Sequence, residues 1–285
     1  MKTRIDKARR SVKEFLTDFF HALRKNEMVI LPGNLAFYFV LAIMPTLSML
    51  SLGASILNLS TDVISNFLTN SFSKEMADLI LGIHLEEFFG LEFILTIIIS
   101  VYVSTNGADA IILASNTIYN VPNNSWIKRR IKALGMTFLI SLLILFMLIV
   151  PVFGETIITL IEEVNLNSVL TSKIVSAFHL IQGPVTWLIM FVIIKMLYKI
   201  APDERKKGRV TTYGAIFTTI MFLVVTKVYS LYVANYASYQ ALYGGLANII
   251  VLMIWLYMLS LIFTIGIALN VEKDNNLLKN TKHNK

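Results

Sequence analysis

The 285-residue sequence contains no cysteine, and charged residues make up only 15% of it. Without cysteine the chain has no disulfides, zinc–thiolate sites, iron–sulfur clusters or cysteine nucleophiles. Soluble proteins carry about 25% charged residues, whereas 56% of this chain is hydrophobic. A soluble domain of this length needs more polar surface than this composition provides. The composition therefore predicts a polytopic membrane protein of the all-α class.

Six segments are apolar enough to cross a bilayer, which takes about 20 residues of helix. We expect the chain to be organised around the last of them, which has no charged residue from Ile249 to Leu269. Small residues in or beside that run would let a neighbouring helix come close; they are Gly244, Gly245, Ala247 and Gly266. The predicted spans are residues 35–57, 91–119, 133–155, 174–198, 210–236 and 245–270, which form a transmembrane domain over residues 35–270.

Prolines and glycines are expected to break several of these helices. Pro32–Asn34 should separate the first span from the segment before it, and the second span is expected to be interrupted within Ser104–Asp109. The predicted helix breaks inside the spans are Pro45, Gly107, Gly183 and Pro184. Breaks in the first and fourth spans would suit two inverted halves of three spans, as in many secondary transporters. Prolines are also common in membrane helices without any such role.

The lysines and arginines are distributed unequally between the two sides of the predicted membrane domain. Residues 1–31, 120–132, 199–209 and 271–285 together hold 21 of the 25. The positive-inside rule therefore places both termini in the cytoplasm and gives six spans. The basic face and the net charge of +7 are then explained by anionic membrane lipid as the partner, and no nucleic acid is expected.

Three segments outside the spans are predicted to be two amphipathic helical segments and a polar tail. Residues 1–34 are basic and have apolar residues at helical spacing, which predicts an amphipathic cytoplasmic helix. It lies either on the membrane surface or on the protein's own cytoplasmic face. Residues 60–90 keep helical spacing too and predict an amphipathic external segment, either a surface connector or a lid. Residues 271–285 are expected to form a polar cytoplasmic tail.

Several motifs resemble those of the YihY/BrkB-like family of bacterial inner-membrane proteins. They are the first-span run Leu35–Pro45, the Leu197–Pro202 run ahead of a basic loop, and the Tyr243–Ala247, Trp255–Tyr257 and Gly266–Asn270 runs of the last span. The resemblance implies a six-helix inner-membrane protein, and some members are linked to envelope or lipid transport. The family also carries an old ribonuclease label, ribonuclease BN, that is generally thought mistaken.

Polar residues inside membrane spans are the default candidates for function. Asn106, Asp109 and Asn116 lie at i, i+3 and i+10 of the second span, on one face of a helix. A charge at Asp109 must face a wet cavity or a partner, or be protonated. We predict that these three residues line a substrate path together with Gln182 and with Lys227, which would supply positive charge in the outer half. The alternative is an interhelical hydrogen-bond cluster that only aligns the bundle.

The leading functional hypothesis is a transporter or flippase for a lipid-linked or amphiphilic, possibly anionic, envelope solute. The second is a non-catalytic scaffold or accessory subunit with an envelope-biogenesis partner or a second copy of the chain. An enzyme is not expected, because no metal cluster, nucleophile motif or close carboxylate pair is present. The four histidines are scattered, so a metal-dependent ribonuclease is not expected either. No nucleotide-binding motif occurs, and no cofactor or metal is predicted.

Overall fold

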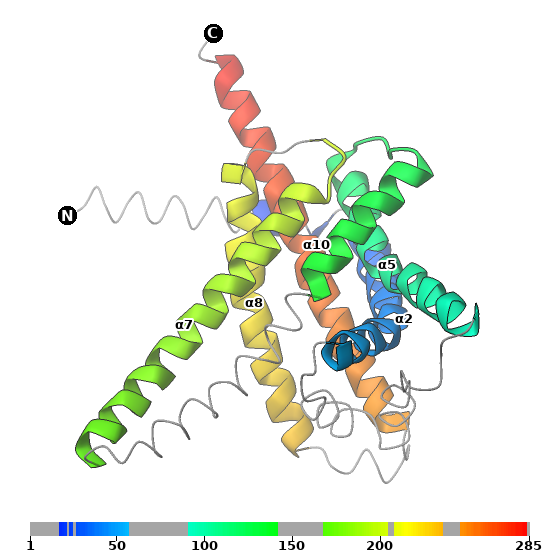
Figure 1. Ribbon diagram of the computed structural model, residues 1–285. Helices are drawn as coiled ribbons and strands as arrows, with labels where there is room; N and C mark the ends of the chain where they lie inside the picture. The colour runs from blue at the N-terminus through cyan, green and yellow to red at the C-terminus, as the bar shows by residue number, and fades with distance from the viewer. Residues whose placement is uncertain are drawn as a thin grey trace, which may run out of the picture.

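The computed structural model describes residues 17–21, 23–24, 27–56, 91–141, 168–204, 208–235 and 246–283. Every regular element within these ranges is an α-helix, so the predicted all-α class is confirmed for the described part of the chain. The helices are α2 (Glu27–Ile56), α5 (Leu91–Tyr119), α7 (Ser168–Ile200), α8 (Gly208–Asn235) and α10 (Leu246–His283) (Figure 1). A further helical segment covers residues 126–141.

Four helices of the described residues contain stretches long and apolar enough to cross a membrane. The stretches are Ile98–Tyr119, Gly183–Ile200, Gly208–Tyr229 and Ile250–Leu277. A helix satisfies its backbone hydrogen bonds internally, which is why such apolar runs fold as helices in lipid. The fold is therefore that of a helical polytopic membrane protein. The count of six spans and the cytoplasmic position of both termini stay predictions.

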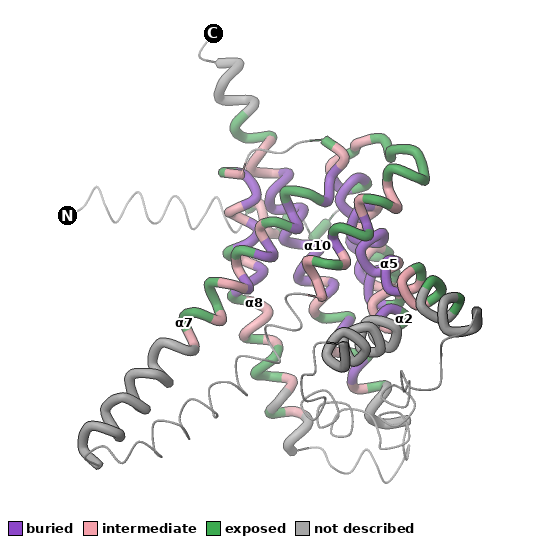
Figure 2. The backbone as a smooth tube through the Cα atoms, in the orientation of Figure 1, coloured by how far each residue is buried: buried purple, intermediate pink, exposed green. Residues whose placement is uncertain are grey.

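Helix α10 lies at the centre of the bundle, as the sequence predicted for its charge-free run. It packs against α2, α5 and α8, while α2 also packs on α5, and α7 on α8 (Figure 1). Residues 262–271 of α10 are all buried, on every side of the helix. A helix that is buried all round needs apolar or internally bonded residues on all faces. Figure 2 shows the buried residues gathered where α10 meets its neighbours.

Two glycines allow α8 and α10 to pack closely. A Cβ atom on Gly214 of α8 would collide with the Gly266 carbonyl oxygen and the Asn270 side chain of α10. A Cβ atom on Gly266 would collide with the side chains of Tyr198 and Thr218. The predicted role of Gly266 in a close helix approach is therefore confirmed. Of the other predicted small residues, Gly244 and Gly245 lie outside the described residues.

Tyr198 connects the end of α7 to the interiors of α8 and α10. Its hydroxyl donates to the Phe263 carbonyl oxygen at 2.9 Å and lies 2.6 Å from the Thr218 hydroxyl oxygen. The Tyr198 and Phe263 ring centroids are 4.6 Å apart. The side chain is fully buried, so both contacts form away from water. They fix the end of α7, from which the chain turns through residues 201–204 into the polar site described below.

The predicted helix breaks are corrected by the structure. The helical backbone continues through Pro45 in α2, through Gly107 in α5 and through Gly183–Pro184 in α7. Helix α2 also begins at Glu27, before Pro32–Asn34, so those residues do not end a helix. A proline inside a helix removes one backbone hydrogen bond. Packing and the need for internal hydrogen bonds keep the rest of a membrane helix intact.

The described part of the basic N-terminal segment packs on the protein itself. Phe19 contacts Phe217 of α8, with ring centroids 5.9 Å apart, and His21 Nδ1 lies 3.3 Å from Glu272 Oε1 of α10. These contacts favour the interpretation that this part of the N-terminal segment covers the protein's own face. Residues 1–16 of the predicted amphipathic helix, the whole external segment 60–90 and residues 142–155 of the third predicted span lie outside the described residues.

Candidate functional site

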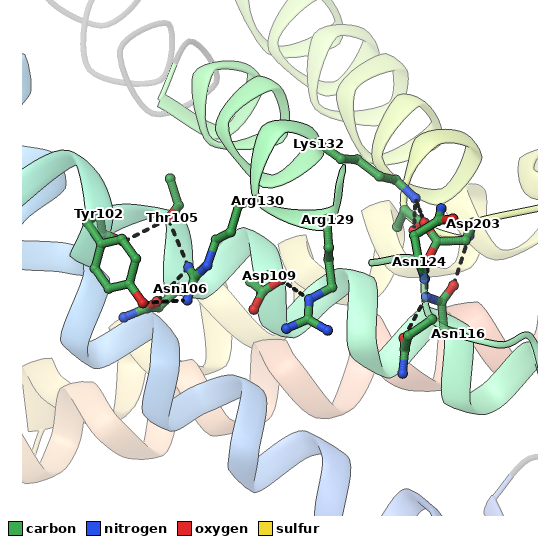
Figure 3. Close-up of polar contacts among 12 residues, drawn as sticks. Tyr102, Thr105, Asn106, Asp109, Asn116, Asn124, Arg129, Arg130, Lys132 and Asp203 are labelled. Atoms are coloured by element: carbon green, nitrogen blue, oxygen red, sulfur yellow. Dashed lines mark hydrogen bonds and ion pairs between the residues drawn. The ribbon is translucent and has the colours of Figure 1, made fainter. Parts of the chain in front are cut away.

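The polar face of α5 is covered by the helix that follows it in the chain. Asp109 and Asn116 are buried, at 7% and 1% exposure, and Asn106 is half-buried. Opposite them lies the helical segment of residues 126–141, which crosses over α5 and brings basic side chains onto it (Figure 3). The three residues predicted from their spacing therefore do share one face, and that face meets protein.

Asp109 is paired with Arg129. The Arg129 Nε atom donates to Asp109 Oδ1 at 2.7 Å, and the two side chains are only 19% and 11% exposed. A charge-assisted hydrogen bond of this length, held away from bulk water, is stronger than a neutral one. A carboxylate inside a membrane span must face a wet cavity, be protonated or have a partner. Here the structure shows a charged partner.

Arg130 occupies the neighbouring part of the same face. Its Nη1 atom donates to Asn106 Oδ1 at 3.0 Å and to Thr105 Oγ1 at 3.2 Å, and its Nη2 atom donates to the Tyr102 hydroxyl at 3.1 Å. The guanidinium carbon also lies 4.5 Å from the Tyr102 ring centroid and 5.9 Å from that of Trp126. All of these partners are neutral. Stacking on aromatic faces is a favourable environment for a guanidinium.

Asn116 and Lys132 converge on Asp203, in the turn between α7 and α8. Asn116 Nδ2 donates to Asp203 Oδ2, and the Asp203 backbone N–H donates to Asn116 Oδ1, both at 2.8 Å. Lys132 Nζ donates to Asp203 Oδ1 at 2.8 Å and to the carbonyl oxygens of Ala201 and Pro202. The Asn124 backbone N–H donates to Asp203 Oδ2 at 2.9 Å. One carboxylate thus joins α5, the 120–132 connection and the α7–α8 turn.

These contacts determine the ionisation of Asp203. Burial raises the pKa of its carboxyl group, but the hydrogen bonds from Lys132, Asn124 and Asn116 to the charged form have the larger combined effect. They lower the pKa from 3.8 to about 2. Asp203 is therefore a stable anion at neutral pH.

Four residues of this site were not predicted as site residues: Arg129, Arg130, Lys132 and Asp203. The sequence interpretation placed residues 120–132 in a basic loop facing anionic lipid and began the next span at 133. The helix in fact begins at 126, and the Ser125 carbonyl oxygen accepts the Arg129 N–H at 3.0 Å. Serine directly before an apolar run is a common start of a helix. That signal would have placed both arginines in a helix, but not against α5.

The other predicted path residues do not join this cluster in the described part of the structure. Lys227 of α8 is exposed on the outside of the bundle. Gln182 lies within α7, and its side chain is outside the described residues. No group of three or more His, Asp or Glu residues that suits a metal ion occurs among the described residues.

The helices and this buried polar cluster define an integral membrane protein of the helical polytopic class. The chain belongs to the virulence factor BrkB family, whose model matches residues 19–285. This result confirms the family resemblance drawn from the span motifs.

Two relatives each match nearly the whole chain. The chain is 30% identical to the ribonuclease-like protein YfkH of Bacillus subtilis over 260 residues, which is 90% of this chain and 94% of YfkH. It is 25% identical to a UPF0761 membrane protein of Vibrio atlanticus over 269 residues, 93% of this chain and 84% of that protein. No solved structure matches the chain.

Proposed function

We propose that this protein is a six-span inner-membrane transporter or flippase for a lipid-linked or amphiphilic envelope solute, with both termini in the cytoplasm. One observation carries the proposal. Along α5, from Tyr102 to Asn116, five polar or charged side chains bond to residues of the 126–141 helix or of the α7–α8 turn; they are Tyr102, Thr105, Asn106, Asp109 and Asn116. Polar and ionisable residues inside membrane segments are retained chiefly where a solute or ion passes.

The charges of this cluster suit an anionic solute. Arg129, Arg130 and Lys132 face only two carboxylates, Asp109 and Asp203, within the cluster. Arg129 and Arg130 lie within the first two turns of the 126–141 helix. They therefore still count toward the excess of cytoplasmic positive charge in the positive-inside rule. A basic cluster inside the bundle would attract an anionic group.

The test is transport by the purified protein in liposomes. A fluorescent anionic phospholipid and its zwitterionic counterpart are placed in the outer leaflet, and the fraction that becomes protected from a membrane-impermeant quencher is followed. The proposal predicts protein-dependent movement that Asn106→Ala and Asp109→Asn slow strongly. Thr117→Ala is the matched control, because its hydroxyl donates only to the Leu113 carbonyl of its own helix at 2.8 Å. Protein-dependent movement that both site variants leave unchanged removes these residues from the path.

A second function, that of a non-catalytic scaffold, is favoured by a different observation. Asp109 and Asp203 each have a basic partner inside the cluster, at 2.7 and 2.8 Å. A static polar network that fixes the packing of helices requires each charged group to have a partner within the network, as these two carboxylates do. A scaffold would co-purify with a stoichiometric envelope-biogenesis partner and would move no lipid in the liposome assay.

The ribonuclease-like name of YfkH is not extended to this chain. A metal-dependent nuclease needs clustered histidine and carboxylate ligands, and the sequence places its histidines far apart. We therefore retain a non-enzymatic membrane protein as the proposal.

A further inference from the structure

Arg130 is the uncompensated charge of the α5 cluster. Arg129 is neutralised by Asp109 and Lys132 by Asp203, through bonds of 2.7 and 2.8 Å. Arg130 bonds only to the neutral oxygens of Tyr102, Thr105 and Asn106, and no carboxylate pairs with it among the described residues. A half-buried guanidinium without a counter-ion is an unfavourable arrangement unless an anion joins it.

The guanidinium also has donors left over. Its Nη1 atom has two bonds and its Nη2 atom one, whereas Nε is buried and has no hydrogen-bond partner in the described structure. A buried donor without an acceptor is destabilising, and native proteins rarely leave one. The Nε and Nη2 atoms form one edge of the planar group, the edge that accepts two oxygens of a carboxylate or phosphate side by side.

The surroundings of Arg130 suit an amphiphile. Tyr102 and Trp126, which flank the guanidinium, are 49% and 57% exposed. Beyond Trp126 the outer face of the same helix carries exposed apolar residues at helical spacing: Ile127, Ile131, Leu134 and Phe138. An anionic head held by Arg130 would therefore have its apolar tail against an apolar helix face, with aromatic rings at the boundary.

We propose that Arg130 is a binding residue for a phosphate oxyanion, that of a phospholipid headgroup or of a soluble phosphate, with Tyr102 and Trp126 beside it. The phosphate accepts from Nη2, which has only one bond, and Thr105 and Asn106 hold Nη1 in place. This inference deepens the transport proposal by naming the group that the path recognises. Binding is measured without transport, so each of the two proposals can fail alone.

The test compares Arg130→Gln with two other variants of the full-length protein. Arg130→Lys keeps the charge and loses the planar fork. Lys128→Gln removes one positive charge from an exposed neighbour in the same helix and leaves the cluster untouched. All are reconstituted in phosphatidylcholine nanodiscs containing phosphatidylglycerol, and the lipid that stays bound after transfer to detergent is counted by native mass spectrometry. The soluble source is tested by titrating inorganic phosphate against the fluorescence of Trp126 in a Trp187→Phe/Trp255→Phe background.

We expect Arg130→Gln to reduce retained phosphatidylglycerol by about tenfold or more, as loss of a charge-assisted contact implies. Arg130→Lys should give a smaller loss and Lys128→Gln almost none. A lipid effect without a phosphate response assigns the site to a headgroup, and an Arg130-dependent phosphate response assigns it to a soluble phosphate. Equal losses in Arg130→Gln and Lys128→Gln, or no binding of either probe to the folded wild type, overturn the proposal. If Arg130→Gln fails to fold, the retained phosphatidylglycerol is counted for Arg130→Lys and Tyr102→Phe instead, and a loss relative to Lys128→Gln supports the proposal.

Discussion

Asp109 and Arg129 lie twenty positions apart in the sequence and are joined by a 2.7 Å bond between Oδ1 and Nε. The bond fixes the helix of residues 126–141 across the polar face of α5. Removing either partner leaves the other charge uncompensated in a largely buried place, which is more harmful than removing both.

Asp109→Asn and Arg129→Gln are each expected to destabilise the protein by about 1–3 kcal/mol, the range for a buried group left without its partner. The double variant should lose less than the sum of the two. Thermal unfolding in detergent measures all three, and a non-zero interaction free energy is the expected outcome. Strictly additive losses would show that the pair contributes nothing as a pair.

Asp203 predicts a dependence of stability on pH. Its pKa is lowered from 3.8 to about 2, so its stabilising contribution is complete above the pKa of the unfolded chain. The contribution falls between about pH 4 and pH 2 as the folded-state carboxylate becomes protonated, and amounts to at most about 2 kcal/mol. Unfolding followed across that range should show this loss in the wild type and a smaller loss in Asp203→Asn. Identical acid profiles for the two proteins would contradict the assignment.

Asn116→Ala should loosen the connection between α5 and the α7–α8 turn. The side chain both donates to and accepts from Asp203 at 2.8 Å, and it also donates to Asn123. Hydrogen exchange measured by mass spectrometry is expected to speed up in residues 201–204 and 120–125, because the Asp203 N–H loses its acceptor. The neighbouring variant Thr117→Ala serves as control and should leave both segments protected. Unchanged exchange in Asn116→Ala would mean that this amide does not hold the turn.

Gly214→Ala should weaken the packing of α8 on α10. The added methyl group meets the Gly266 carbonyl oxygen, a backbone atom that cannot rotate away. Overpacking of this kind typically costs about 1–3 kcal/mol. Gly135→Ala is the matched control, since nothing lies within 4 Å of the added atom and alanine is a better helix former by about 1 kcal/mol. A thermal midpoint lowered in Gly214→Ala and unchanged or raised in Gly135→Ala is expected; equal midpoints would contradict the close approach.

The sequence predicted the helical class and the central helix because long charge-free runs have few other structures open to them in lipid. It also placed Asn106, Asp109 and Asn116 on one face, since helical spacing alone decides that. Their partners depend on tertiary contacts, namely how the 126–141 helix crosses α5 and where the α7–α8 turn brings Asp203. The prediction of a helix break at Gly107 was wrong because it also left out tertiary contacts. This glycine lies against Phe39 of α2, with 3.0 Å between the ring and a Cβ placed on Gly107. Its small size serves helix packing.

The measurement that tests the central claim most directly is access of water to position 106 in the working protein. The chain has no cysteine, so Asn106→Cys introduces the only thiol of its variant, and a membrane-impermeant thiol reagent is applied from each side of sealed vesicles. Ile112→Cys, at a fully buried apolar position of the same helix, provides the dry control, and Lys128→Cys the exposed one. The transport account predicts that the thiol of Asn106→Cys is labelled from at least one side, far faster than the thiol of Ile112→Cys. A folded Asn106→Cys protein whose thiol is as unreactive from both sides as that of Ile112→Cys would contradict a transport path and favour the scaffold.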